Sequence, residues 1–131
     1  MPVSGTEWRT IFKYFNEIIT PALRELKRRY PEEIESLPRG INAVKWTVAS
    51  IVLPRLKGFA KSTVGIPSKE EVARKIAEIL ATVTPEQVEE VYRAKAKSTK
   101  ALMGTEHLAG TVARMVMELK NLLGVPAYVY A

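Results

Sequence analysis

The chain has 131 residues and a mass of 14.7 kDa, which suits one domain with a real hydrophobic core and is too short for two ordinary domains. It contains neither cysteine nor aspartate, which excludes disulfides, thiolate nucleophiles, cysteine metal sites and aspartate-based triads. A formal net charge of +6 and a pI near 9.7 favour polyanionic partners, either nucleic acid or an anionic membrane surface.

Neither a membrane span nor a secretion signal is expected. The longest apolar run, residues 48–53, is far shorter than the roughly 20 residues that cross a bilayer. Residues 1–5 lack the basic and apolar regions of a secretory signal, so we expect the protein to stay inside the cell that makes it. Asparagine and glutamine are scarce, a composition typical of heat-adapted proteins.

Residues 1–39 are predicted to form a helical N-terminal arm. The Ser4-Gly5-Thr6-Glu7 spacing indicates a capping box, in which a hydroxyl and a carboxylate satisfy backbone N–H groups at a helix start. The helix should either kink or restart at Thr20-Pro21 and end before a short helical turn at residues 31–35. Pro38-Arg39-Gly40 should then break the chain.

The apolar residues of this arm need burial, because side chains of this kind are rarely left in water as a group. Since prolines divide the arm into rigid pieces, we expect these residues to pack on another subunit. They are Ile11, Phe12, Phe15, Ile18 and Ile19.

Residues 40–124 are predicted to form an all-α four-helix bundle, because apolar residues recur at helical spacing and strand patterns are nearly absent. The first helix follows Gly40, with a kink expected at Pro54. The second and third begin at the capping boxes Ser68-Lys69-Glu70-Glu71 and Thr84-Pro85-Glu86-Gln87.

The end of the chain is expected to add one more helix and a tail. The helix from Thr84 should reach Gly104 with Met103 facing inward, and Thr105 should cap the last helix. Residues 125–131 form an apolar, uncharged tail that should dock on its own core or on a neighbouring subunit.

The segment from Arg39 to Lys61 contains five basic residues and no acidic one. They are Arg39, Lys45, Arg55, Lys57 and Lys61. A segment with charges of one sign repels itself unless something negative lies against it, so these residues are predicted to bind a polyanion. The alternative is that the last three only complement the dipole at a helix C-terminus.

Three weaker basic clusters accompany this segment. Arg93, Lys97 and Lys100 would share a helix face and could bind DNA, although acidic-first and basic-last also suits the helix dipole. Arg9 and Lys13 could place a basic, aromatic-flanked edge on the arm. A cluster interleaved with and followed by glutamates is predicted to be solvated or ion-paired. It comprises Arg24, Lys27, Arg28 and Arg29.

No catalytic constellation is found, so we expect no enzyme activity, cofactor or metal. His107 is the only histidine and has neither aspartate nor cysteine as a partner, which favours a surface role. Nucleotide-binding and zinc-protease motifs are absent. Trp8 and Trp46 are interpreted as core or interface anchors.

In its size, lack of cysteine, basic charge, proline-broken arm, helical bundle and apolar tail, the chain resembles the major coat proteins of archaeal filamentous viruses. The resemblance implies a virion protein, made in the host cytoplasm, that wraps linear double-stranded DNA and holds it in A-form. It also implies identical or paralogous partner subunits, possible enclosure by an outer envelope, and DNA contacts from basic residues. Here those are Arg9, Lys13, Arg39, Lys45, Arg55, Lys57 and Lys61, with Arg93, Lys97 and Lys100 as further candidates.

Two other function classes are open. The chain could be a small helical subunit of a CRISPR-type ribonucleoprotein that binds a nucleic-acid backbone, in which case aromatic side chains should be available for base stacking on its basic face. It could also be a protein–protein adaptor, in which case no contact should depend on salt.

Overall fold

The structure, a computed structural model, describes residues 5–125 and is all-α over this range, as the sequence predicts. Short 3-10 turns, η1 and η2, lie between the last two α-helices. The elements are α1 (Gly5–Arg29), α2 (Pro31–Glu35), α3 (Ile41–Ser62), α4 (Lys69–Ala81), α5 (Pro85–Ser98), η1 (Lys100–Leu102), η2 (Glu106–Leu108) and α6 (Ala109–Leu122).

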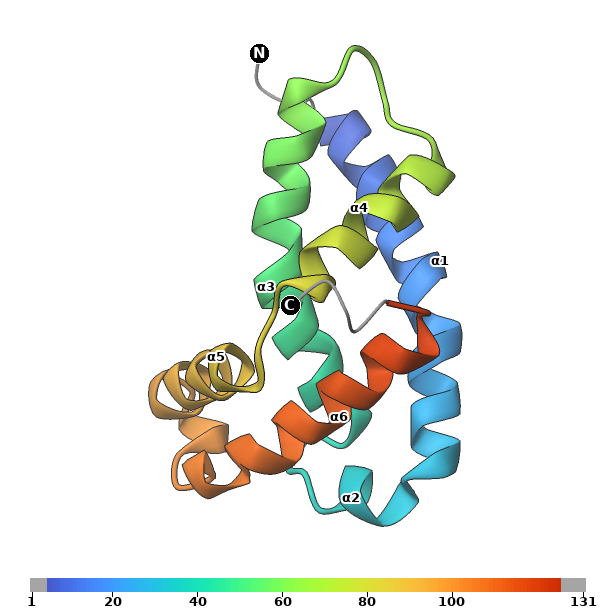
Figure 1. The fold of residues 1–131 in the computed structure, drawn as a ribbon. Coiled ribbons are helices and arrows are strands. Elements are labelled where there is room, and N and C mark those ends of the chain that lie inside the picture. The colour runs from blue at the N-terminus through green and yellow to red at the C-terminus, as the bar shows by residue number, and fades with distance from the viewer. Residues whose placement is uncertain (1–4, 126–131) are drawn as a thin grey trace.

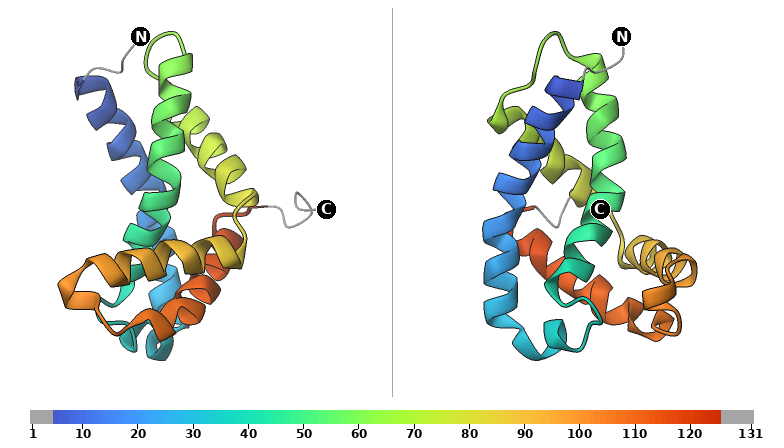
Figure 2. Two further views of the ribbon diagram at one scale, coloured as in Figure 1. Left: turned by 90° about the vertical axis from the view of Figure 1, so that its left-hand side faces the viewer. Right: turned by 180° about the vertical axis from the view of Figure 1, so that it is seen from behind.

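The two longest helices, α1 and α3, run in opposite directions along the molecule (Figure 1). Helix α4 contacts both of them, while α5 and α6 form an antiparallel pair that lies across their other half (Figure 2). Helix α6 also packs on α1, so the first and last helices are neighbours. The α3–α4 loop and α2 lie at opposite ends of the molecule (Figure 1).

Helix α1 is part of the same core as the rest of the chain. Ile11, Phe15 and Ile19 recur every four residues on one face of α1, and each is at most 1% exposed. They belong to one cluster with buried residues of α3, α4, α5 and α6. The expectation that they pack on another subunit is therefore wrong for this face, although Phe12, on the outer side, is 41% exposed.

Both internal prolines lie within continuous helices. Pro21 is inside α1 and Pro54 is inside α3, although each removes one backbone donor. In α1, Ile19 and Leu23 on either side of the proline are buried in the core. We infer that tertiary packing holds the two halves of this helix together where the sequence alone allowed a restart.

Side-chain caps fix two helix starts, as predicted. Ser68 Oγ accepts from the Glu71 N–H at 3.1 Å, and Thr84 Oγ1 accepts from the Gln87 N–H at 3.2 Å, each with the reciprocal bond. The structure of the capping box at Ser4 falls outside the described residues. Gly40 precedes α3 with φ +56°, a conformation that favours glycine, in agreement with the predicted break.

The segment between α5 and α6 differs from the prediction. Helix α5 ends at Ser98 because Thr99 is extended, so Met103 is 65% exposed instead of facing inward. Thr105 does not cap α6: its hydroxyl hydrogen-bonds with Tyr92 Oη at 3.0 Å and donates to the Leu102 carbonyl. Of the predicted tail, only Val125 lies within the described range, and it is buried.

Candidate nucleic-acid interface

The basic segment from Arg39 to Lys61 takes no part in the ion pairs between described residues. Those pairs lie in α1, α4 and α5 or join α1 to α4. The paired cations are Lys13, Arg28, Arg29, Lys69, Lys75 and Arg93. Within residues 5–125, the cations of the acid-free segment therefore have no carboxylate partner, and all except the half-buried Lys45 are exposed.

These cations do not share one side of α3. Lys57 and Lys61 are one turn apart and lie on the same side of the helix. Arg55 is two residues before Lys57 and points about 160° away from it, at 3.6 residues per turn. Lys45 lies about 120° from Lys57 by the same geometry, so α3 presents positive charge to more than one surrounding surface.

A basic patch that includes a tryptophan lies where the C-terminal part of α3 meets the start of α1. Lys57 Nζ lies 5.7 Å from the centroid of the half-buried Trp8 ring, which joins the end of α3 to the start of α1 (Figure 1). Lys61 lies one turn further along α3, and the exposed Arg9 follows Trp8 on α1. Lys13, also on α1, is engaged with Glu17 at 4.0 Å.

The predicted patch on α5 is not a single helix face. Arg93 is bound to Glu89 at 2.7 Å, and Lys97 is exposed on the same helix. Lys100 lies in η1, beyond the end of α5, so the expected face of three cations is incomplete. Helix α5 therefore offers fewer unpaired cations than α3.

Trp46, on α3, is half-buried against α5, in agreement with a packing role. Its ring stacks on Tyr92 at 5.8 Å between centroids and 10° between planes. Lys95 Nζ lies 5.9 Å from the Trp46 centroid, so this cation covers the ring.

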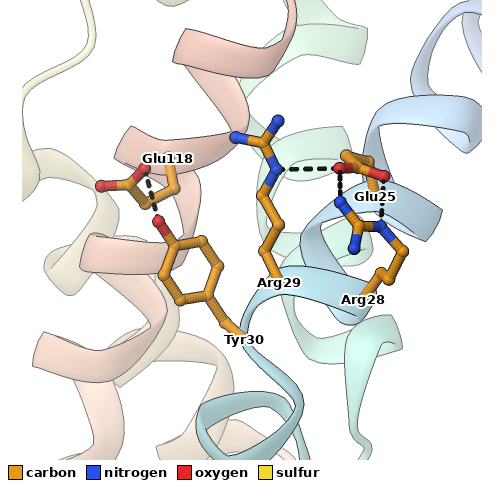
Figure 3. Close-up of polar contacts among 5 residues, drawn as sticks. All are labelled: Glu25, Arg28, Arg29, Tyr30 and Glu118. Carbon is orange, nitrogen blue, oxygen red and sulfur yellow. Dashed lines mark hydrogen bonds and ion pairs between the residues drawn. The ribbon is translucent and has the colours of Figure 1, made fainter.

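The arginine- and lysine-rich cluster of α1 is solvated or ion-paired, as predicted. Arg28 and Arg29 are ion-paired as expected, both with Glu25, and Figure 3 shows the three side chains together. Hydrogen bonds from Arg28 and then Arg29 lower the pKa of Glu25 from 4.5 to about 2. Arg24 and Lys27, by contrast, are exposed and have no carboxylate partner in the described part of the chain. Their spacing from Glu25, one and two residues, could have indicated this, because such neighbours do not face each other on a helix.

A buried lysine also escaped the sequence analysis. Lys120 on α6 is 4% exposed, and its Nζ donates to the Val83 carbonyl at 3.0 Å. Burial lowers the pKa of this amine because the charged form loses hydration. Lys120 therefore ties α6 to the α4–α5 connection and is not part of the basic surface.

Acidic side chains line a groove of about 510 Å³ between α2, the start of α5 and α6. Glu33, Glu89 and Glu118 line it, and Tyr30 Oη donates to Glu118 Oε2 at 3.0 Å (Figure 3). This bond raises the pKa of Tyr30. The lining carries these three carboxylates and one cation, Arg114, so the groove is an unfavourable surface for a polyanion.

His107 is exposed, and its Nδ1 lies 3.2 Å from the Gly104 carbonyl oxygen. Among the described residues, no group of three or more histidine or glutamate side chains is placed to hold a metal ion. None of the helices in the same range is long and apolar enough to cross a bilayer.

Comparisons with known proteins give no match: no protein-family model, no curated protein and no solved structure is significantly similar to this chain.

Proposed function

We propose that this chain is a structural coat protein that binds the backbone of linear double-stranded DNA without sequence preference. The observation that carries the proposal is the set of five cations from Arg39 to Lys61 that no described carboxylate neutralises. A lysine or arginine without a carboxylate partner can bind a phosphate without first breaking an ion pair. Each such contact also releases counterions of the DNA, which favours binding.

The arrangement of these cations suits backbone contact better than base recognition. Lys45 and Lys57 are about 18 Å apart along α3 at 1.5 Å per residue, which is the length of several base-pair steps of a duplex. They also point to different sides of the helix. Charges that are spread in this way can meet successive phosphates, but they do not converge on the edge of a base.

Duplex DNA is favoured over single-stranded nucleic acid because the tryptophan rings near the basic residues are in use. Lys57 lies over Trp8, while Tyr92 and Lys95 lie against Trp46. Single-strand binding of the kind expected in a CRISPR-type ribonucleoprotein relies on aromatic faces that are open to bases.

In this proposal the protein acts in the nucleocapsid of a virion and assembles with copies of itself or with a paralogous coat protein, around DNA in A-form. The buried apolar face of α1 is used inside the chain, so contacts between subunits need another surface. Exposed apolar side chains outside that face are available for them, namely Val64, Ile66 and Met103.

The test compares two variants that remove the same number of positive charges. One replaces Lys45, Arg55, Lys57 and Lys61 with glutamine, and the control replaces the ion-paired Arg28, Arg29, Lys69 and Lys75. The measurement is the slope of log K against log salt for a duplex of arbitrary sequence. If all four α3 cations contact phosphate, the first variant should lose about 3.6 from the magnitude of that slope, at 0.9 per contact.

The control variant should keep a slope close to that of the parent protein, because its cations are already engaged with glutamates. Equal losses in both variants would mean that net charge alone attracts DNA. A parent protein whose binding to DNA does not depend on salt would contradict the proposal and favour the adaptor function. Electron microscopy with and without DNA tests the filament directly.

A further inference from the structure

The C-terminal half of α1 and the first turns of α3 enclose a basic groove of about 250 Å³, here called the α1–α3 groove. Three of its lining residues are cations from two different helices, and none is acidic. The lining residues are Thr20, Leu23, Arg24, Lys27, Ile41, Asn42 and Lys45. A hollow that gathers positive charge without compensation is costly for the folded chain alone, because like charges repel.

The acid nearest in sequence to these cations is withheld from the groove. Arg28 Nε donates to Glu25 Oε2 at 2.9 Å, and Arg29 Nε donates to Glu25 Oε1 at 2.8 Å (Figure 3). The carboxylate of Glu25 is thus shared by two arginines outside the groove lining. Arg24 and Lys27, one turn apart on α1, are left facing Lys45 of α3 across the groove.

The neutral lining completes a surface for an oxyanion. The Thr20 hydroxyl and the Asn42 amide can both donate hydrogen bonds. The first turn of α3 carries no acidic residue and no side-chain cap, so the positive end of the dipole of this 22-residue helix adds to the charge of the lysines and the arginine. At about 30 Å³ per water, the groove holds about eight waters, which is room for a phosphate group that keeps part of its hydration.

We propose that the α1–α3 groove is a phosphate site that anchors one phosphodiester of a nucleic-acid backbone. Arg24 supplies a planar guanidinium that can bind two phosphate oxygens at once, while Lys27 and Lys45 act as point charges from two sides. The assignment of this phosphate to DNA rests on the proposed function. The groove differs from the other basic residues of α3 because its charges converge on one position.

Inorganic phosphate is the probe, titrated into ¹⁵N-labelled protein at low ionic strength. Amide resonances of Ile41, Asn42 and Lys45 should shift and saturate, because they lie beside the bound ion. The double variant Arg24→Gln/Lys27→Gln should weaken this phosphate affinity about tenfold or more, and Lys45→Gln should weaken it in the same direction from the other helix.

The matched control is Arg74→Gln/Arg114→Gln, which removes the same charge from two exposed arginines that do not line the groove and have no ion pair among the described residues. It should leave the phosphate affinity within about twofold of the parent and also keeps Glu25 bound to Arg28 and Arg29. Circular dichroism establishes that each variant is folded. Absence of saturable shifts at residues 41–45, or equal weakening by both double variants, overturns the phosphate site.

A DNA titration of the same proteins separates this inference from the proposed function. Salt-dependent DNA binding without a phosphate response in the groove would overturn the groove and leave the coat function standing. A saturable phosphate response in a protein that does not bind DNA would support the groove and overturn the coat function.

Discussion

Helices α1 and α3 are similar in sequence terms but differ in how their cations are used. Both are long, contain an internal proline and carry basic residues in the last turn. In α1, Glu25 lies three and four residues before Arg28 and Arg29, so those charges are satisfied within the helix. In α3 there is no acid at any spacing. The comparison teaches that the charge available to a ligand depends on the register between acids and bases more than on the number of bases.

The prediction with the largest expected effect on the free energy of unfolding tests whether α1 belongs to the core. Replacing Phe15 with alanine should destabilise the chain by about 3–5 kcal/mol, because it empties a fully buried site. Phe12→Ala on the exposed side of the same helix should cost less than about 1 kcal/mol. Denaturant unfolding followed by circular dichroism measures both. Similar values for the two variants would mean that α1 is a loosely attached arm after all.

The second prediction concerns a variant in which the last turns of α1, like those of α3, carry cations without a carboxylate partner. Glu25→Gln removes the shared acid and frees Arg28 and Arg29, so the slope of log K against log salt for duplex DNA should steepen by up to about 1.8. Glu70→Gln is the control, because it raises the net charge equally at an exposed position without an ion pair among the described residues. An unchanged slope in the Glu25 variant would show that register does not control access to these arginines.

The smallest effect concerns the buried cation Lys120. The folded-state pKa of Lys120 is lowered by burial, so in the window between that value and the ordinary 10.5 the unfolded chain binds more protons. The free energy of unfolding should therefore rise with pH across this window, and Lys120→Met should lack this increment. At neutral pH the variant should lie within about 1 kcal/mol of the parent, since the hydrogen bond to Val83 and the desolvation penalty of the amine are lost together.

A difference between parent and variant that stays constant with pH would contradict this assignment for Lys120. Thermal unfolding at several pH values from neutral up to 10.5 provides the measurement. The subtraction cancels the titration of groups common to both proteins.

The sequence predicted those parts of the fold that depend on local chemistry. The capping boxes at Ser68 and Thr84 place two helix starts because their hydrogen bonds span only three residues. The prediction that Met103 faces inward was wrong because no local sequence signal indicates that Thr99 is extended and ends α5. The prediction that Thr105 caps α6 was also wrong, since its hydroxyl hydrogen-bonds with Tyr92. For Thr105, a hydrogen bond to a side chain 13 residues away decided the outcome.

The sequence predicted which residues carry the positive charge of the candidate site, but not how these residues are arranged in space. An acid-free run from Arg39 to Lys61 can be read directly from the chain. The convergence of Arg24 and Lys27 with Lys45 could not, because it depends on how α1 packs beside α3. For the same reason the apolar face of α1 was assigned to another subunit: sequence periodicity shows that a face is buried but not by which partner.

The packing of α1 on α6 also constrains the order in which the chain can fold. Tyr30, which directly follows α1, is hydrogen-bonded to Glu118 of α6, 88 residues away in the sequence. During synthesis α1 leaves the ribosome before α6, which provides one of the surfaces that cover it. Until α6 is complete, part of the apolar stripe of α1 lacks its native cover and is open to chaperones or to aggregation. The contact between α1 and α6 closes a long stretch of chain, so the fold depends on non-local contacts. A nascent chain that stops before α6 therefore cannot bury its apolar core completely.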